Sequence, residues 1–457
     1  MSFVGIDDTD SPRGGCTTFV LTEVLRAARR LGLDLLGDPA LVRLDPNVPF
    51  RTRGNGALAA RFGHGEGGGR VVGRLPEGAV RSFRRGRPPT ATETLDLVEA
   101  AWTAVRRNSR RGEPGTDPAL VVVPRRPPAA LYWSAVQRRI SRAPVERLLR
   151  SLGAEVRTER SRRSGIVGAA AAVAWPGRHP TFELLAYRSP PRWGRPRRID
   201  PTAVPRLERE YPELFLCRDP ATRRLLLAPH TPCPILFGLR AGRPDRLVAA
   251  ARRLPAGEPW ERWLLFRTNQ GTGDHLVRAT VAGMRPFAAG AIGGTVDSVP
   301  ELLRGGHVRF WLRDRPGDRI PCLAFEPTKT LPRLARLLWP GDRILAWGGC
   351  GADPVLRLEG IRLIRTVPRL RAGPNPLCPR CGRRTKSLGA GRGFRCPGDH
   401  LRLPPESRGA VASAPPPAPG WYHPTPSARR HLAPRPAGPG GDPVRWWLRR
   451  PRTDLYG

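Results

Sequence analysis

The spacing of hydrophobic residues changes along the first 130 residues. Residues 3–6 form a short apolar run typical of a strand. Apolar positions then recur at helical spacing over residues 19–31 and again over residues 91–107. The Arg- and Pro-rich stretch 81–89 is predicted to be a loop, and residues 108–118 are predicted to be a linker. The pattern predicts an α/β unit that opens with a strand, a turn and a helix.

A second unit is predicted from residue 131 to residue 270. A helix-forming run covers residues 132–153, and the small residues 165–175 are predicted to begin a β-rich stretch. Residues 181–188 alternate partly between polar and apolar positions, as a strand does. A helix over residues 245–254 and a strand over residues 260–267 follow. This order of elements predicts a ferredoxin-like α+β unit.

The next hundred residues are dominated by short strands. Five or six strands and one short helix, over residues 331–338, favour an OB-type barrel, although another small barrel fits the same pattern. The predicted strands cover residues 276–281, 294–299, 308–312, 319–325, 343–347 and 356–365. The Pro-, Arg- and Gly-rich end of the chain is predicted to be a largely flexible basic tail. The fold class is therefore α+β multidomain, divided at residues 1–130, 131–270, 275–368, 374–403 and 404–457.

Charge narrows the choice of partner. The 457 residues include 78 Lys and Arg against 39 Asp and Glu, a formal net charge of +39. Such an excess favours a polyanionic partner, and nucleic acid is the natural one. Because Lys329 and Lys386 are the only lysines, a high-GC coding bias toward Arg contributes, but it does not explain the shortage of acids. No apolar run reaches about eighteen residues, so we expect no membrane partner and a cytoplasmic location.

Three carboxylates, Asp7, Asp8 and Asp10, follow the first strand directly. Carboxylates in this position can hold Mg²⁺, and the backbone amides of residues 15–18, at a helix start, offer an anion site. Together they can seat a nucleoside triphosphate, although the turn carries no Lys and is not a Walker loop. The alternative is a solvated turn with a helix N-cap. Three neighbouring carboxylates repel one another more than such a turn requires.

A basic loop follows the first helix. Arg51 and Arg53 can neutralise phosphate oxygens, and Gly54 and Gly56 allow the backbone to come close to a ligand. The alternative is a surface turn with exposed arginines, which is common in so basic a chain.

A polar turn over residues 266–275 is the second candidate site. Asn269, Gln270, Asp274 and His275 supply donors and acceptors that fit a base, a ribose or an amine. A turn that joins two domains is the alternative.

The cysteines predict a metal site near the C-terminus. Cys378, Cys381 and Cys396 have the spacing of a zinc ribbon with two knuckles. The fourth ligand is Asp399, which has the better spacing, or His400, which is chemically the better zinc partner and which we assign to the site. If neither coordinates, the loop is metal-free.

Several motifs occur in the order found in one known family. They are residues 4–10 with 15–18, residues 51–57, residues 267–272, the zinc ribbon, Trp421-Tyr422 and residues 426–431. Over most of the chain they resemble the TiaS family, the 2-agmatinylcytidine synthetases of isoleucine tRNA. The resemblance implies a kinase-like domain, a ferredoxin-like domain, an OB fold and a zinc ribbon. It also implies ATP, Mg²⁺ and Zn²⁺ as cofactors, an isoleucine tRNA as partner and agmatine as substrate.

The implied reaction is the ATP-dependent conversion of the first anticodon cytidine into 2-agmatinylcytidine. Phosphate activates carbon 2 of the base, and agmatine displaces it. By resemblance Thr17 is the autophosphorylated threonine, and agmatine lies near residues 165–175 and 181–188. The implied catalytic residues are Asp7, Asp8, Asp10, Thr17 and Thr18, and the implied ATP-binding residues are Gly14, Gly15, Cys16, Arg51, Arg53 and Asn55. A non-catalytic RNA-binding protein, or an RNA-modifying enzyme that uses another amine, remains the alternative.

Overall fold

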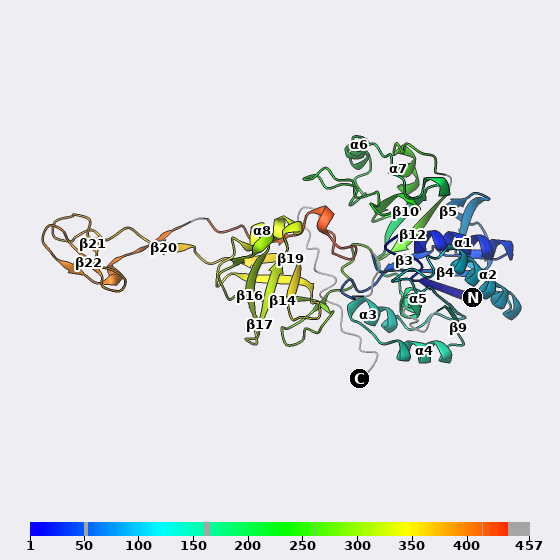
Figure 1. Ribbon diagram of the computed structural model, residues 1–457, viewed down its shortest axis with the longest axis horizontal. Helices are drawn as coiled ribbons and strands as arrows, with labels where there is room; N and C mark the ends of the chain where they lie inside the picture. Colours follow the sequence, from blue (N-terminus) through cyan, green and yellow to red (C-terminus); the bar gives the residue numbers. More distant parts are fainter. Residues whose placement is uncertain (50–53, 160–164, 261, 414, 437–457) are drawn as a thin grey trace.

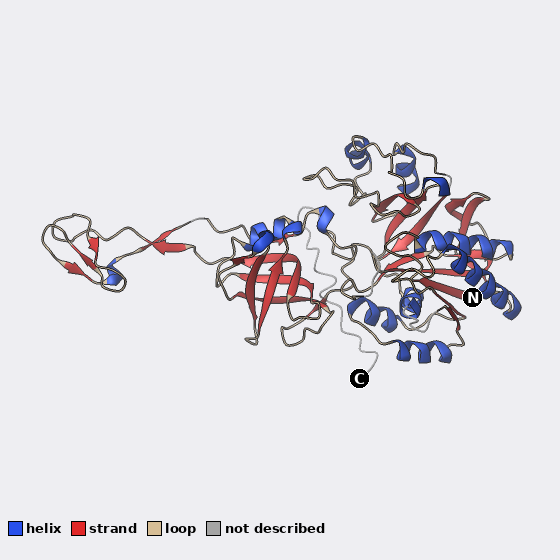
Figure 2. Cartoon of the chain, viewed as in Figure 1, coloured by secondary structure: helices blue, strands red, loops and turns tan. Residues whose placement is uncertain are grey.

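The chain folds into a wide lobe, a barrel beside it and a small ribbon at the far end (Figure 1). The computed structural model describes residues 1–49, 54–159, 165–260, 262–413 and 415–436. Figure 2 shows that helices cover the sheet of the wide lobe, whereas the barrel and the ribbon consist mainly of strands and loops. Within the described part of the chain, no helix is both long enough and apolar enough to cross a bilayer. The architecture is mixed α+β with several parts.

One large sheet forms the centre of the wide lobe. Its main path runs β11-β10-β12-β5-β6-β2-β4-β1-β8-β9, with β3 joined to β12 and β4, and β7 joined to β4. The strands are β1 (Ser2–Asp7), β2 (Asp34–Leu36), β3 (Ala40–Arg43), β4 (Gly56–Glu66), β5 (Arg70–Leu75), β6 (Gly78–Phe83), β7 (Arg85–Arg87), β8 (Ala119–Val123), β9 (Glu155–Thr158), β10 (Thr181–Tyr187), β11 (Ile235–Ala241) and β12 (Arg262–Thr268). Strands from both of the first two predicted units therefore share one sheet.

Two hydrophobic cores lie on opposite faces of this sheet. In β8, Leu120 and Val122 contribute to one core, and Val121 and Val123 contribute to the other, because neighbouring side chains of a strand point to opposite faces. The first core also takes residues from α1, α2, α6 and α7, and the second from α3, α4 and α5. The helices are α1 (Thr17–Arg30), α2 (Ala91–Asn108), α3 (Ala129–Gln137), α4 (Arg142–Ser151), α5 (Gly165–Ala174), α6 (Ala203–Glu210) and α7 (Leu247–Arg253).

Three local predictions for this lobe are wrong. The small-residue stretch is the helix α5 and not the start of a β-rich segment, because Ala is the best helix former and the stretch contains no Pro. Its small side chains allow close packing on the sheet, where a Cβ at Gly5 of β1 would overlap the Ala169 carbonyl. The run 132–153 is split into α3 and α4, and the predicted loop 81–89 contains the end of β6 and β7. Strand β6 pairs with β2, and strand β7 pairs with β4, and these partners are distant in sequence.

The strand-rich region closes into a barrel, as predicted. Strand β14 pairs with both β18 and β16, so the two ends of the sheet meet. Its strands are β13 (Val277–Arg278), β14 (Ala289–Val296), β15 (Glu301–Leu302), β16 (Val308–Asp314), β17 (Arg319–Ala324), β18 (Arg343–Gly349), β19 (Leu356–Arg365) and β25 (Gly420–Tyr422), with the helix α8 (Thr330–Ala335). The predicted strand 294–299 begins earlier, as β14, and the predicted strand 276–281 is shortened to β13.

The ribbon lies beyond the barrel and is joined to it by a narrow two-stranded stem (Figure 1). The stem pairs β20 (Leu370–Ala372) with β24 (Ala410–Ala412). The ribbon holds β21 (Lys386–Ser387), β22 (Phe394–Arg395) and β23 (Arg402–Leu403).

The chain then returns to the body, which corrects the prediction of a largely flexible tail over its described part. Strand β25 adds to β19 of the barrel, and residues 420–436, which we call the return strap, continue to the wide lobe. There the Gly271 and Gly273 amides donate to the carbonyls of His431 and Leu432, each over 2.8 Å. Leu432 is only 1% exposed, in the second core. The strap is held because these bonds satisfy its backbone and because Leu432 is buried.

Candidate functional site

The acidic turn begins where β1 ends. Asp7 is the last residue of β1, and the next residue, Asp8, has a left-handed backbone with φ of 59°. The Asp8 amide donates to Asp7 Oδ1 over 2.8 Å. Burial, together with the charges of Asp8 and Asp10, raises the pKa of Asp7 well above its usual value. Such a cluster favours a bound cation, because a cation offsets the repulsion.

Helix α5 lies against this turn. A Cβ at Gly168 would overlap the Asp7 carboxylate, and one at Gly165 would lie 3.2 Å from the Cβ of Asp8. The glycines of α5 therefore make room for the two carboxylates. This contact is the reason for the small-residue composition of the helix at these positions.

The glycine turn leads into α1. Gly15 has a φ of 77°, and a Cβ there would come within 2.7 Å of Arg110 Cγ. Cys16 is the N-cap of α1, and its side chain makes no capping hydrogen bond. An N-terminus of a helix without a side-chain cap suits an anion. The Cys16 thiol stays protonated because burial raises its pKa to about 11.

A cavity of about 1150 Å³ joins these elements. This volume exceeds that of an ordinary small-molecule pocket and has room for more than one substrate. Of the predicted residues, those that line it are Asp7, Asp8, Asp10, Cys16, Thr17, Thr18, Gly54, Asn55 and Gly56. Gly14 and Gly15 belong to the turn that precedes Cys16 and do not themselves line the cavity. Arg51 and Arg53 lie outside the described residues.

Arginines form much of the cavity wall. They come from several parts of the chain and suit phosphate oxygens. They are Arg43, Arg138, Arg139, Arg142, Arg224, Arg240 and Arg429. Gly54 and Gly56 make room for Arg43, because a Cβ at either would lie within 2.8 Å of Arg43 Nη1.

Glu183 is a buried acid of the cavity wall. It lies on β10, only 1% exposed, and Arg240 Nε contacts its Oε1 at 2.8 Å. The Gln270 side-chain amide donates to its Oε2. Glu183 and Leu185 are two residues apart on β10 and therefore share one face of the strand, and both line the cavity. Periodicity alone did not distinguish Glu183 from an ordinary strand residue.

The polar turn that follows β12 is buried and joins neighbouring parts of the structure. Its four predicted site residues, Asn269, Gln270, Asp274 and His275, do not line the cavity. Asn269 Nδ2 donates to the Arg43 carbonyl and to the Tyr132 hydroxyl, each over 2.8 Å. His275 Nε2 lies 2.9 Å from Glu359 Oε2 of the barrel. The turn thus connects the sheet, α3 and the barrel, as the alternative interpretation predicted.

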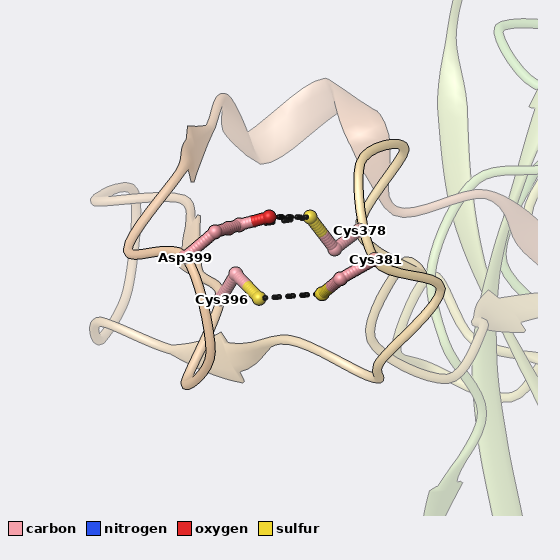
Figure 3. A group of neighbouring side chains, drawn as sticks. All are labelled: Cys378, Cys381, Cys396 and Asp399. Atoms are coloured by element: carbon pink, nitrogen blue, oxygen red, sulfur yellow. Dashed lines mark hydrogen bonds between the residues drawn. The ribbon is translucent and has the colours of Figure 1, made fainter.

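The ribbon brings three thiols and a carboxylate together (Figure 3). The ligand atoms of Cys378, Cys381, Cys396 and Asp399 all lie within 4.8 Å of one another. The Cys378 thiol lies 3.2 Å from Asp399 Oδ2, and the Leu401 amide donates to Oδ1 over 3.1 Å. These bonds, with the Cys378 thiol first, lower the pKa of Asp399 to about 2.

The fourth member of the cluster is Asp399, and not His400, which we assigned to the site from the sequence. The chain takes a left-handed conformation at His400, with φ of 61°, and His400 is not among the clustered residues. The turn places the carboxylate of the preceding residue against the thiols. Asp399, which has the better spacing, is therefore the residue that the fold brings to the thiols.

Comparisons with known proteins agree over nearly the whole chain. Family models described as the TiaS TCKD domain, the TiaS FLD domain and the TiaS C-terminal zinc ribbon domain match residues 3–159, 163–275 and 375–398. A protein of Thermofilum pendens, named as the 2-agmatinylcytidine synthetase TiaS of an isoleucine tRNA, is 38% identical over 456 residues, covering 96% of each chain. A protein of the same name from Methanosarcina mazei is 35% identical, covering 94% of this chain and 96% of its own.

The chain belongs to the TiaS family.

Solved structures of the TiaS family have the same fold. The crystal structure of a complex of TiaS with its isoleucine tRNA and ATP matches with a TM-score of 0.81 and 28% identity, covering 96% of this chain and 99% of the other. The structure of a complex of TiaS with the same tRNA, AMPCPP and agmatine matches with a TM-score of 0.77 and 27% identity, covering 96% and 98%.

Sequence reasoning did not single out several residues of the site that come from separate elements. Arg43, Glu183, Arg240 and His431 all line the cavity, yet they lie on four separate elements. For His431 a signal existed, since it ends one of the motifs shared with the TiaS family. For Arg43 and Arg240, nothing distinguished them from the other arginines.

Proposed function

We infer that this chain makes 2-agmatinylcytidine at the first anticodon position of an isoleucine tRNA, using ATP and agmatine. The observation that carries the inference is the 38% identity, over 96% of both chains, to a 2-agmatinylcytidine synthetase of an isoleucine tRNA. The cavity supports it, because carboxylates, a helix N-terminus and arginines meet in one space.

The reaction has two steps. The γ-phosphoryl group of ATP moves to the oxygen on carbon 2 of cytidine, which turns a poor leaving group into a good one. The primary amine of agmatine then forms a bond to carbon 2, and phosphate leaves with the electron pair of the C–O bond. Charge builds on phosphorus, so positioned cations provide most of the catalysis. An anticodon base reaches such a cavity at low cost, because its loop is already single-stranded.

We assign the N-terminal residues to the phosphoryl-transfer step. The raised pKa of Asp7 and its acidic neighbours fit a divalent cation, so Asp7, Asp8 and Asp10 would hold Mg²⁺, which supplies charge neutralisation. Residues 16–18 and Asn55 hold the nucleotide phosphates, with Gly14 and Gly15 shaping the turn. Thr17, which is 7% exposed, is the residue assigned to autophosphorylation.

Each part of the chain has its own role, and we assign tRNA binding to the barrel and the ribbon. We assign residues 1–130 to a kinase-like domain, residues 131–270 to a ferredoxin-like domain and residues 275–368 to an OB fold. The three thiols and the carboxylate of the ribbon fit zinc chemistry. Cys378, Cys381, Cys396 and Asp399 would hold Zn²⁺, which supplies a structural crosslink in a segment with little hydrophobic core.

The decisive experiment supplies all the substrates together. The protein is incubated with the isoleucine tRNA, ATP, Mg²⁺ and agmatine, and the nucleosides are analysed by mass spectrometry. We expect a cytidine with the added mass of agmatine less water. Asp8→Asn should abolish the product, and Asp96→Asn, an exposed residue of α2, should not. A protein that binds tRNA but forms no product with any amine would overturn the proposal.

A further inference from the structure

The return strap carries a histidine into the active-site cavity. Strand β25 leaves the barrel, Ser427 donates a backbone hydrogen bond to Asp219 over 3.2 Å, and His431 lines the cavity. The residue itself is exposed and lines the cavity, whereas Leu432, the next residue, is buried in the core. Its Nε2 edge faces Gly54, where an added Cβ would lie 3.3 Å from Nε2, and Gly54 also lines the cavity.

A chain of hydrogen bonds determines which nitrogen of His431 carries the proton. A carboxylate only accepts, so the nitrogen of the Gln270 amide must face Glu183, as observed. The Gln270 oxygen is then left facing His431 Nδ1, 3.0 Å away. An amide oxygen also only accepts, so Nδ1 must donate. Neutral His431 therefore carries its proton on Nδ1 and presents the lone pair of Nε2.

The charged groups around His431 keep the ring neutral. Arg43 on β3 lowers the pKa of His431 well below its usual value, with smaller contributions from desolvation by the surrounding protein and from the charge of Arg240 on β11. The one acid of this network, Glu183, is already neutralised by Arg240. The imidazole is thus neutral at neutral pH, and among the described residues no hydrogen bond to its Nε2 occupies the lone pair.

The other candidate bases of the described cavity wall are already engaged. Both oxygens of Glu183 have partners, Arg240 and Gln270. Arg224 Nε donates to His230 Nε2 over 3.1 Å. The Cys16 thiol is protonated, and Asp7, Asp8 and Asp10 are assigned to the cation.

We propose that His431 Nε2 is the catalytic base that takes a proton from the agmatine amine as it attacks carbon 2 of the activated cytidine. This proposal rests on the proposed function. The N–C bond forms, the C–O bond to phosphate breaks with its electron pair leaving on phosphate, and the proton passes from the amine to Nε2 and then to water. Gln270 is a positioning residue, because it holds the ring through Nδ1.

His431→Asn tests the proposal, because the Asn amide can still donate to Gln270 but offers no Nε2. We expect its rate with agmatine to fall on the order of 100-fold, since base catalysis contributes about 10²–10⁴-fold. The KM values for ATP and tRNA should stay near those of the wild type. The ATP-dependent step, followed as phosphate transfer without agmatine, should be unchanged and also reports that the variant is folded.

Two comparisons separate base catalysis from a structural role. The nitrogen of a weakly basic amine such as methoxyamine becomes more acidic as it bonds to carbon 2 and loses its proton to water more readily, so the variant should lose far less rate with it than with agmatine. His431→Gly should regain activity with added imidazole. His179→Asn is the matched control, because His179 is exposed and its φ of 51° is tolerated by Asn.

An agmatine rate within threefold of the wild type for His431→Asn would overturn the proposal. So would an equal loss with agmatine and methoxyamine, or an equal loss in the ATP step. Failure of the proposed function is distinguishable, because the wild-type protein would then form no agmatine product.

Discussion

Gly168 of α5 lies against the carboxylate of Asp7, and no side chain at position 168 fits beside it, since even a Cβ would overlap Asp7 Oδ2. A helix of the second family-matched region thus sets the position of the acid at the end of β1. Because we assign Asp7 to phosphoryl transfer, this contact links α5 to that proposed role.

Gly168→Ala should therefore reduce the ATP step at least 100-fold, because small displacements at a reacting centre cost that much. Its fold should persist, because the overpacking, which costs about 1–3 kcal/mol, is partly offset by the preference of about 1 kcal/mol that Ala has over Gly in a helix. Phosphate transfer from labelled ATP measures the effect. Gly293→Ala is the control, because an added Cβ there meets nothing within 4 Å. Full activity of Gly168→Ala would contradict the role of this contact.

Asp7→Asn should stabilise the metal-free protein while it abolishes activity. The folded protein raises the pKa of Asp7, so the ionised carboxylate costs stability at pH values above that raised pKa, and the cost disappears as the pH falls through it. We expect a higher urea midpoint for Asp7→Asn at pH 8 without Mg²⁺, and a smaller difference at pH 5. An equal difference at both pH values would argue against this charge effect.

Asp399 should be the fourth zinc ligand. Asp399→Asn should weaken zinc binding about tenfold or more, and Asp399→Cys should retain it, because a thiolate completes the usual tetrahedron. Chelator competition measures the affinity, and Co²⁺ absorption reports the number of thiolate ligands. His400→Asn is the matched control, because Asn tolerates the φ of 61°. If His400→Asn loses zinc and Asp399→Asn does not, the assignment fails.

Leu432→Ala should destabilise the protein by about 2–5 kcal/mol, the usual cost of truncating a buried Leu. Leu432 is 1% exposed, whereas Leu370 is 55% exposed, and Leu370→Ala should cost less than about 0.5 kcal/mol. Urea unfolding measures both values. Equal costs would mean that the return strap contributes no more to stability than a surface segment.

Binding of tRNA should weaken steeply with salt, because arginines that replace counterions on phosphates lose their advantage as salt rises. Arg139→Ala, in the cavity wall, should reduce the slope of log affinity against log salt by about 1. Arg29→Ala, exposed and outside the cavity wall, should leave it unchanged. Filter binding at several KCl concentrations distinguishes the two, and a flat salt dependence of the wild type would refute the expectation.

Local patterns were reliable where neighbouring residues decide the structure. The turn from Asp7 to Thr18 follows from an apolar run, three acids, two glycines and a helical period, which all lie within one short segment. The spacing of the three cysteines likewise predicted the ribbon cluster. Their chemistry could be inferred because strand ends and helix starts have the same geometry in any fold.

The rest depended on contacts between distant segments. Helix α5 looked like a β-rich stretch because small residues have little period of their own, and its packing on β1 decides its place. Glu183, Gln270 and His431 come together only in the folded structure. The barrel and the ribbon separate Gln270 from His431 in the sequence, and the return strap brings His431 back to the wide lobe. No local pattern encodes such a meeting, because it is determined by burial and hydrogen bonding between segments up to several hundred residues apart. The acidic turn was therefore evident from the chain alone, whereas the base that we propose in the same cavity was evident only once the chain was folded.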